Sequence, residues 1–158
     1  MDATTDRRLG RAALIVTTLI IVIVGITAAI AFRPKGDIDI PAAWRSQSEF
    51  TLIIFGRDSC PACQASTDFH KALAAAAEAN GVRAVAALTA SMGDPAQFAA
   101  ALGVSPDRAI RANPAPEHLK SVPTVIVVNR NGDVLKKTEG VLSADKQRAL
   151  LNFVANLR

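Results

Sequence analysis

Two cysteines, Cys60 and Cys63, are the only ones in the 158 residues, and Pro61 and Ala62 separate them. A short apolar, partly β-branched run at 51–55 precedes the pair, and an alanine-rich, helix-forming stretch follows it. Less than one turn of helix therefore separates the two thiols, which is close enough for a disulfide to form and break. The pattern predicts redox chemistry by thiol–disulfide exchange.

The start of a helix favours a thiolate, because the positive end of the helix dipole stabilises the negative sulfur. Cys60 is expected in the first turn, with Ser59 as the N-cap and Pro61 where a missing N–H costs nothing. We therefore expect Cys60 to be the nucleophile. Cys63 is expected to be less exposed and to resolve the mixed disulfide that Cys60 forms with a substrate.

A metal site is the first competing interpretation of the pair. Structural zinc takes about four ligands, and the sequence has no second Cys-X-X-Cys. His70 lies two helical turns beyond Cys63, which leaves His118 as the histidine within reach. A purely structural disulfide is the second competitor, but so small a loop restrains little of the unfolded chain. Redox chemistry without a cofactor or a resident metal is favoured.

The apolar excess of the chain is concentrated near the N-terminus. Residues 12–32 carry no charge, and Arg11 and Arg33 flank them. A helix of that length spans about 30 Å, the thickness of the hydrocarbon core of a membrane. We expect a retained transmembrane anchor. A cleaved secretory signal is the alternative, because Ala29-Ile30-Ala31 resembles a small-X-small cleavage site.

The anchor divides the chain into four parts. These are an N-terminal tail at 1–11, the anchor at 12–32, a linker at 33–47 and a folded domain at 48–158. The compact cluster of Arg7, Arg8 and Arg11 favours a cytoplasmic N-terminus. The folded domain is then expected outside the cytoplasm, on the periplasmic side of a cell membrane.

Apolar runs and helix signals alternate along the folded domain. Strands are expected at 51–55, 82–88 and 122–128, with an antiparallel return at 133–138 after the Asn131-Gly132 turn. Helices are expected at 61–80, from Pro95 to Leu102, and from Ser143 to the C-terminus. Residues 104–121 show no clear pattern. This order predicts an α/β fold, with a mixed central sheet covered by helices on both faces.

The strand-Cys60-Pro61-Ala62-Cys63-helix unit, followed by Val122-Pro123-Thr124 before a strand and hairpin, resembles the thioredoxin-like superfamily. The resemblance covers about 48–158. It implies a thioredoxin-like fold and thiol–disulfide oxidoreductase activity. It also implies that Pro123 is a cis proline facing the cysteines, and that the backbone of Val122 pairs with the substrate chain.

The anchor makes the chain similar to membrane-tethered thioredoxin-like proteins that work outside the cytoplasm. The resemblance therefore implies a protein thiol or disulfide as substrate and a membrane electron-transfer partner. The tethered architecture and the Thr after Pro123 favour action as a reductase. The oxidant direction stays open, because some oxidant members of the superfamily have a proline directly after the first cysteine, as Pro61 is here.

Three features depart from the thioredoxin pattern: Cys-Pro-Ala-Cys replaces Cys-Gly-Pro-Cys, Ser59 replaces the Trp that commonly precedes the first cysteine, and the third is the more serious. Thioredoxins carry a buried acid on the strand six residues before the first cysteine, where it helps to move the proton of the resolving thiol, and this position is Ile54. Asp58 or a water could substitute.

Two other functions stay open. Copper chaperones with a related fold use two thiolates and a distant histidine, for which Cys60, Cys63 and His118 are the candidates. A non-catalytic docking module is the third possibility. Nucleic-acid binding is not expected, because the 18 Lys and Arg and the 14 Asp and Glu are spread along the chain rather than clustered.

Overall fold

The computed structural model describes residues 48–89, 92–112 and 119–157. The elements are β1 (Phe50–Gly56), α3 (Pro61–Ala65), α4 (Thr67–Ala79), β2 (Arg83–Leu88), α5 (Pro95–Ala101), η1 (Pro106–Arg108), β3 (Ala109–Arg111), β4 (Thr124–Asn129), β5 (Val134–Glu139) and α6 (Ala144–Ala155). The expected tail, anchor and linker at 1–47 lie outside the described residues. Within the described ranges, no helix is long and apolar enough to cross a membrane.

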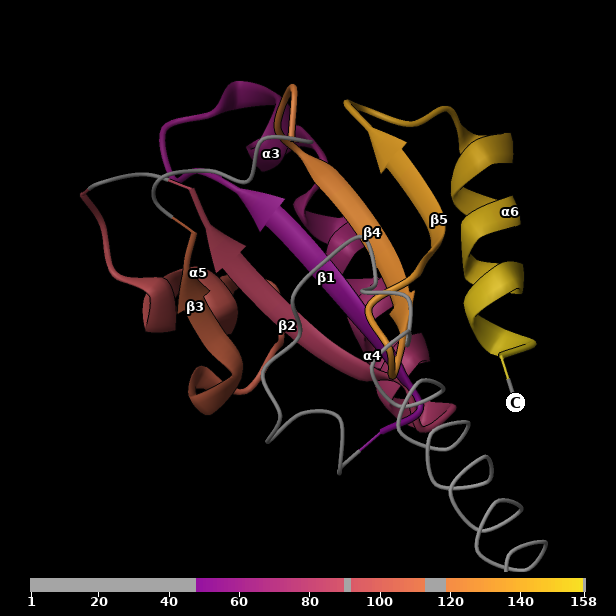
Figure 1. Ribbon diagram of the computed structural model, residues 1–158. Helices are drawn as coiled ribbons and strands as arrows, with labels where there is room; N and C mark the ends of the chain where they lie inside the picture. The colour runs from indigo at the N-terminus through magenta and orange to yellow at the C-terminus, as the bar shows by residue number, and fades with distance from the viewer. Residues whose placement is uncertain (1–47, 90–91, 113–118, 158) are drawn as a thin grey trace, which may run out of the picture. The chain divides into compact units, whose positions relative to one another are not determined.

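The five strands form one mixed sheet in the order β3-β2-β1-β4-β5 (Figure 1). β1, β2 and β3 run parallel, whereas β4 pairs antiparallel with both β1 and β5. The mixed sheet and the β4–β5 hairpin confirm the expectation from the sequence. β1 has a partner on each side and is buried from Thr51 to Gly56. The strand that leads to the cysteines is therefore held in the middle of the sheet.

Alternation along β1 divides the core between the two faces of the sheet. Leu52 and Ile54 belong to one cluster, and Ile53 and Phe55 belong to the other. Burial on both faces explains why the run is apolar throughout, because neither set of side chains meets water.

The prediction of helices on both faces is met on one face only within the described residues. The helices α4, α5 and α6 all contribute to the cluster of Leu52, and Figure 1 shows α4 and α5 behind the sheet. On the second face, the partly buried residues packed against the cluster are Ile110 of β3 and residues outside the helices such as Leu119 and Val122. These residues have no helical periodicity, so the sequence did not predict that they would cover the second face of the sheet.

The single helix expected at 61–80 is wrong, because α3 ends at Ala65 and α4 begins at Thr67. The hydroxyl of Ser66 donates to the Ala62 carbonyl at 2.9 Å, and the hydroxyl of Thr67 donates to the Cys63 carbonyl at 3.2 Å. Such bonds from Ser and Thr to the preceding turn compete with the helix ladder and bend helices. The break therefore lies at Ser66, shortly beyond the Cys-X-X-Cys turn.

Two further boundaries differ from the prediction. The unassigned stretch at 104–121 contains the three-residue strand β3, which forms by pairing with β2. So short a strand has no detectable period of its own. The strand expected at 122–128 begins at Thr124, since Pro123 has no N–H to give to a sheet ladder.

Truncating the centre of β1 should test this core. Leu52 is 0% exposed, so Leu52→Ala is expected to lower the free energy of unfolding by about 2–5 kcal/mol through lost burial and a cavity. Leu135→Ala is the matched control, because Leu135 lies on the edge strand β5 and is 41% exposed. Its effect should stay within about 0.5 kcal/mol. Urea unfolding of the full chain measures both, and equal losses would contradict the assigned core.

Candidate active site

The end of β1 is packed so closely that a side chain at position 56 would require the Phe98 ring to move. A Cβ on Gly56 would lie 2.6 Å from Cζ of Phe98 and 3.7 Å from Sγ of Cys63. The bare backbone lets the Phe98 ring of α5 rest against the strand end. This contact holds the strand end against the helix layer, three exposed residues before Cys60.

Cys60 itself is the N-cap of α3, and the expectation of Ser59 as the cap is wrong. The backbone of Cys60 is extended (φ −93°, ψ 112°), and its Sγ accepts a hydrogen bond from the N–H of Cys63 at 3.2 Å. Pro61 takes the first helical position, which leaves the residue before it to cap the helix. The sulfur thus occupies the place that a Ser or Asp oxygen takes in most helices.

The two thiols lie in unequal surroundings. Cys60 is partly exposed, whereas Cys63 is 7% exposed, and both are free thiols in the described structure. Burial, together with the hydrogen bond to the Cys60 side chain, raises the pKa of Cys63 to about 12. The inner sulfur is therefore held as a neutral thiol while the outer sulfur faces solvent. This difference matches the roles that the sequence predicts for the two residues.

The segment before β4 completes the site. The Val122–Pro123 peptide bond is cis, and the carbonyl oxygen of Val122 lies 3.7 Å from Sγ of Cys60, as acceptor of its S–H. Pro123 lines a pocket together with Cys63, and its own carbonyl accepts the N–H of Gly140 at 2.7 Å. The structure thus brings together all four residues that the sequence singled out for the site.

The described residues do not build a metal centre. Among them, no group of three or more His, Cys, Asp or Glu side chains is placed to hold an ion. His118, the third ligand in the copper interpretation, lies outside the described residues.

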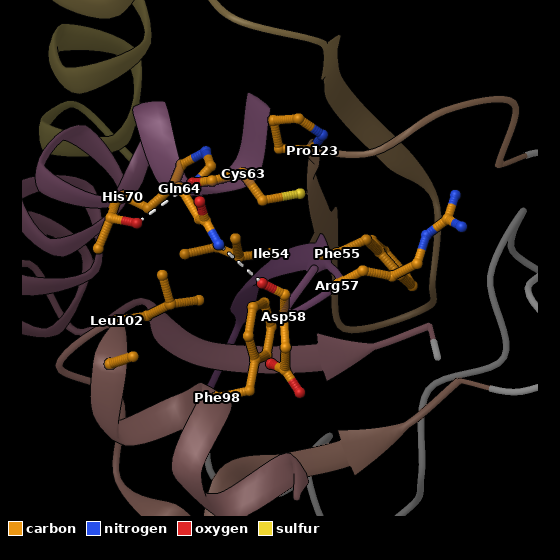
Figure 2. Close-up of a pocket in the computed structure, with 13 residues that line it drawn as sticks. Ile54, Phe55, Arg57, Asp58, Cys63, Gln64, His70, Phe98, Leu102 and Pro123 are labelled. Atoms are coloured by element: carbon orange, nitrogen blue, oxygen red, sulfur yellow. Dashed lines mark hydrogen bonds between the residues drawn. The ribbon is translucent and has the colours of Figure 1, made fainter. Parts of the chain in front are cut away.

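A pocket of about 170 Å³ opens beside Cys63 (Figure 2). Ile54, Phe98 and Leu102 are apolar parts of its lining, and Gln64, Thr67 and His70 are polar parts. Gln64 is fixed by its side-chain amide, which donates to the carbonyl of Asp58 at 3.1 Å.

His70 is the pocket residue that the sequence analysis missed, having weighed it only as a metal ligand. It is 4% exposed, and burial lowers its pKa to about 4. The imidazole is therefore neutral at physiological pH. One signal was present in the sequence, because in the single helix expected at 61–80 a residue seven positions after Cys63 falls on the same side.

A family model describing a thioredoxin-like domain matches residues 41–155. The chain belongs to the thioredoxin-like family. Within the described residues, the Cys-X-X-Cys turn follows a central strand and a cis proline lies opposite it, as the resemblance implies. No curated protein sequence matches the chain.

Solved structures show the same fold at low sequence identity. A protein from Chlorobium tepidum, assigned as a thiol:disulfide interchange protein DsbE, is 21% identical, with a TM-score of 0.56 over 74% of this chain and 86% of its own. A protein from Neisseria meningitidis, assigned as a thioredoxin, is 18% identical, with a TM-score of 0.55 over 73% and 79%. These structures therefore share the thioredoxin-like fold with this chain, although the sequence identity is too low to show the fold by itself.

Buried His70 should make the stability of the domain sensitive to acid. The folded pKa is about 4 and the ordinary value is 6.5, so the unfolded chain binds the proton first as the pH falls. The free energy of unfolding should decrease between pH 6.5 and 4, by about 3 kcal/mol at most. His70→Phe should lack this part of the decrease. Urea unfolding of both full chains across this range measures it, and parallel curves would contradict the assignment.

Proposed function

We propose that this protein is a thiol–disulfide oxidoreductase that acts on protein substrates through Cys60 and Cys63. The observation that carries the proposal is the arrangement of the two sulfurs. A partly exposed Cys60 caps α3 beside the cis Val122–Pro123 bond, and a buried Cys63 donates its N–H to the outer sulfur. Family membership supports the same activity.

In the first step, the thiolate of Cys60 attacks a disulfide of the substrate. A bond forms between Sγ of Cys60 and one substrate sulfur, the substrate disulfide breaks, and the second substrate sulfur leaves as a thiolate. The N–H of Cys63, 3.2 Å from Sγ of Cys60, is placed to stabilise the negative sulfur, since hydrogen bonds to a charged form favour that form.

In the second step, Cys63 attacks Sγ of Cys60. The Cys60–Cys63 disulfide forms, the mixed disulfide breaks, and the remaining substrate thiol is released. The substrate gains two electrons, and the protein loses them. The cycle then needs a reductant, for which we propose a dithiol electron carrier in the membrane.

The segment before β4 is the proposed binding place for the substrate chain. The Val122 carbonyl lies 3.7 Å from Sγ of Cys60 and meets no other donor among the described backbone bonds. An extended substrate backbone could donate an N–H to this oxygen and so place its own sulfur beside Cys60. Pro123 closes the side of the site nearest Cys63.

The location and direction of electron flow are part of the proposal. The charge-free segment at 12–32 supports a membrane anchor, with the thioredoxin-like domain on the periplasmic side. A tethered domain next to a membrane reductant is suited to reducing protein disulfides, so we propose a reductase.

Serine substitutions should separate the two thiols. Cys60→Ser should abolish exchange, because the partly exposed nucleophile is lost. Cys63→Ser should retain the first step and accumulate a mixed disulfide, because resolution is lost. Non-reducing electrophoresis of the full chain after reaction with a disulfide-containing protein measures both. If Cys63→Ser traps nothing while Cys60→Ser still exchanges, the roles are assigned to the wrong residues.

The reduction potential of the pair should report its direction. A reductase should have a potential near that of thioredoxin, about −270 mV. Alkylation of the free thiols of the full chain across defined thiol–disulfide buffers measures it. A potential near that of the oxidant DsbA, about −120 mV, would overturn the reductase direction. Failure to form any disulfide would favour the copper interpretation instead.

A further inference from the structure

Cys63 must lose its proton in a place that water barely reaches. Its side chain is 7% exposed, and burial raises its pKa to about 12. The thiolate is the nucleophile in thiol–disulfide exchange, so the second step needs a group that takes the proton as Cys63 attacks. A neutral base near the buried sulfur would accept this proton without placing a charge in the pocket before the reaction begins.

The pocket beside Cys63 limits the choice of proton acceptor. Its other ionisable lining groups are Arg57, Asp58 and His70, while α5 contributes only Phe98, Ala101 and Leu102. A guanidinium has no lone pair to accept a proton. Ile54, on the strand below the pocket, is also apolar.

Asp58 is poorly placed to act as the base. Its carboxylate contacts the position that a Cβ would take on Gly93, in the loop before α5. Figure 2 shows this carboxylate turned away from Cys63. Asp58 is also exposed, so its charge is solvated by water outside the pocket.

His70 has the position and the chemistry. Cys63 of α3 and Thr67 and His70 of α4 all line the pocket, so the three face one cavity across the break at Ser66. Side chains of a helix lean toward its N-terminus, so the imidazole leans toward Thr67, in the first turn of α4. The His70 side chain is 4% exposed. A neutral imidazole always carries one nitrogen lone pair.

We propose that His70 accepts the proton of Cys63 during resolution of the mixed disulfide, through water in the pocket between them. The proposal rests on the function proposed above. As the Cys63 S–H bond breaks, its electron pair forms the bond to Sγ of Cys60 and the substrate sulfur leaves as a thiolate. The proton passes through water to the imidazole and then to solvent or to the leaving thiolate.

The pocket can hold such a water. A volume of about 170 Å³ exceeds the roughly 30 Å³ that one water takes in the liquid. The side chains of Gln64, Thr67 and His70 supply polar partners along its wall.

The test uses the reduced full chain and an aromatic disulfide, 5,5′-dithiobis(2-nitrobenzoate), whose released thiolate is coloured. Attack by Cys60 releases a first equivalent, and resolution by Cys63 releases a second. His70→Phe removes the base but keeps a ring in the pocket. It should slow the second phase at least about tenfold, the order expected for a general base that water partly replaces, without the same loss in the first phase. Asp58→Asn is the matched control and should leave the second phase unchanged.

Chemical rescue separates a lost base from a damaged fold. His70→Ala opens space for a small ring, and added imidazole should accelerate its second phase in proportion to the free base. Pyrazole has nearly the same shape but is a far weaker base, and it should not restore the rate. An unchanged second phase in His70→Phe, or equal rescue by pyrazole, would overturn the role of His70. Absence of a first phase in the unmodified chain would instead refute the proposed function.

Discussion

The hydrogen bond from the N–H of Cys63 to Sγ of Cys60 is the interaction on which the site depends. It makes one sulfur both the cap of α3 and the proposed nucleophile. Pro61 sets the cap position, and the central strand β1 ends at Gly56, shortly before Cys60. The position of the sulfur is therefore tied to the central strand of the sheet. Helix α3 begins at the proposed nucleophile. The hydrogen bond from the Cys63 N–H satisfies a backbone donor at the start of the helix, and it also favours negative charge on the sulfur.

Burial then makes two identical thiols unequal. Cys63 lies less than a turn further along, beside Gly56 in a pocket that the ring of Phe98 also lines, and desolvation keeps it neutral. In the proposed reaction the order of events follows from this difference, because Cys60 is the partly exposed thiol of the two and its Sγ lies 3.7 Å from the Val122 carbonyl. Once a mixed disulfide occupies Cys60, the nearest thiol is the buried one, and access is no longer needed.

Local patterns in the sequence predicted what depends on neighbouring residues. The buried strand before Cys60, the hairpin after Asn131-Gly132 and the paired thiols all follow from composition and spacing. What the sequence did not predict depends on distant or fine contacts. β3 exists through its pairing with β2, the break at Ser66 comes from side-chain bonds to the preceding turn, and the approach of Pro123 to the cysteines was implied by resemblance rather than by any periodicity. The anchor at 12–32 lies outside the described residues and stays a prediction.

His70 shows how burial can select a base. Removing water favours the neutral form of every ionisable group, but the neutral form of a carboxyl group is the protonated acid, whereas the neutral form of an imidazole is the unprotonated base. A buried acid on the strand, as thioredoxins have at the position of Ile54, must therefore be ionised against its surroundings before it can take a proton. Buried His70, with its pKa lowered to about 4, is already in the accepting form at neutral pH. It becomes charged only when the proton arrives, and the negative charge that develops on the sulfur of Cys63 at that moment offsets the cost.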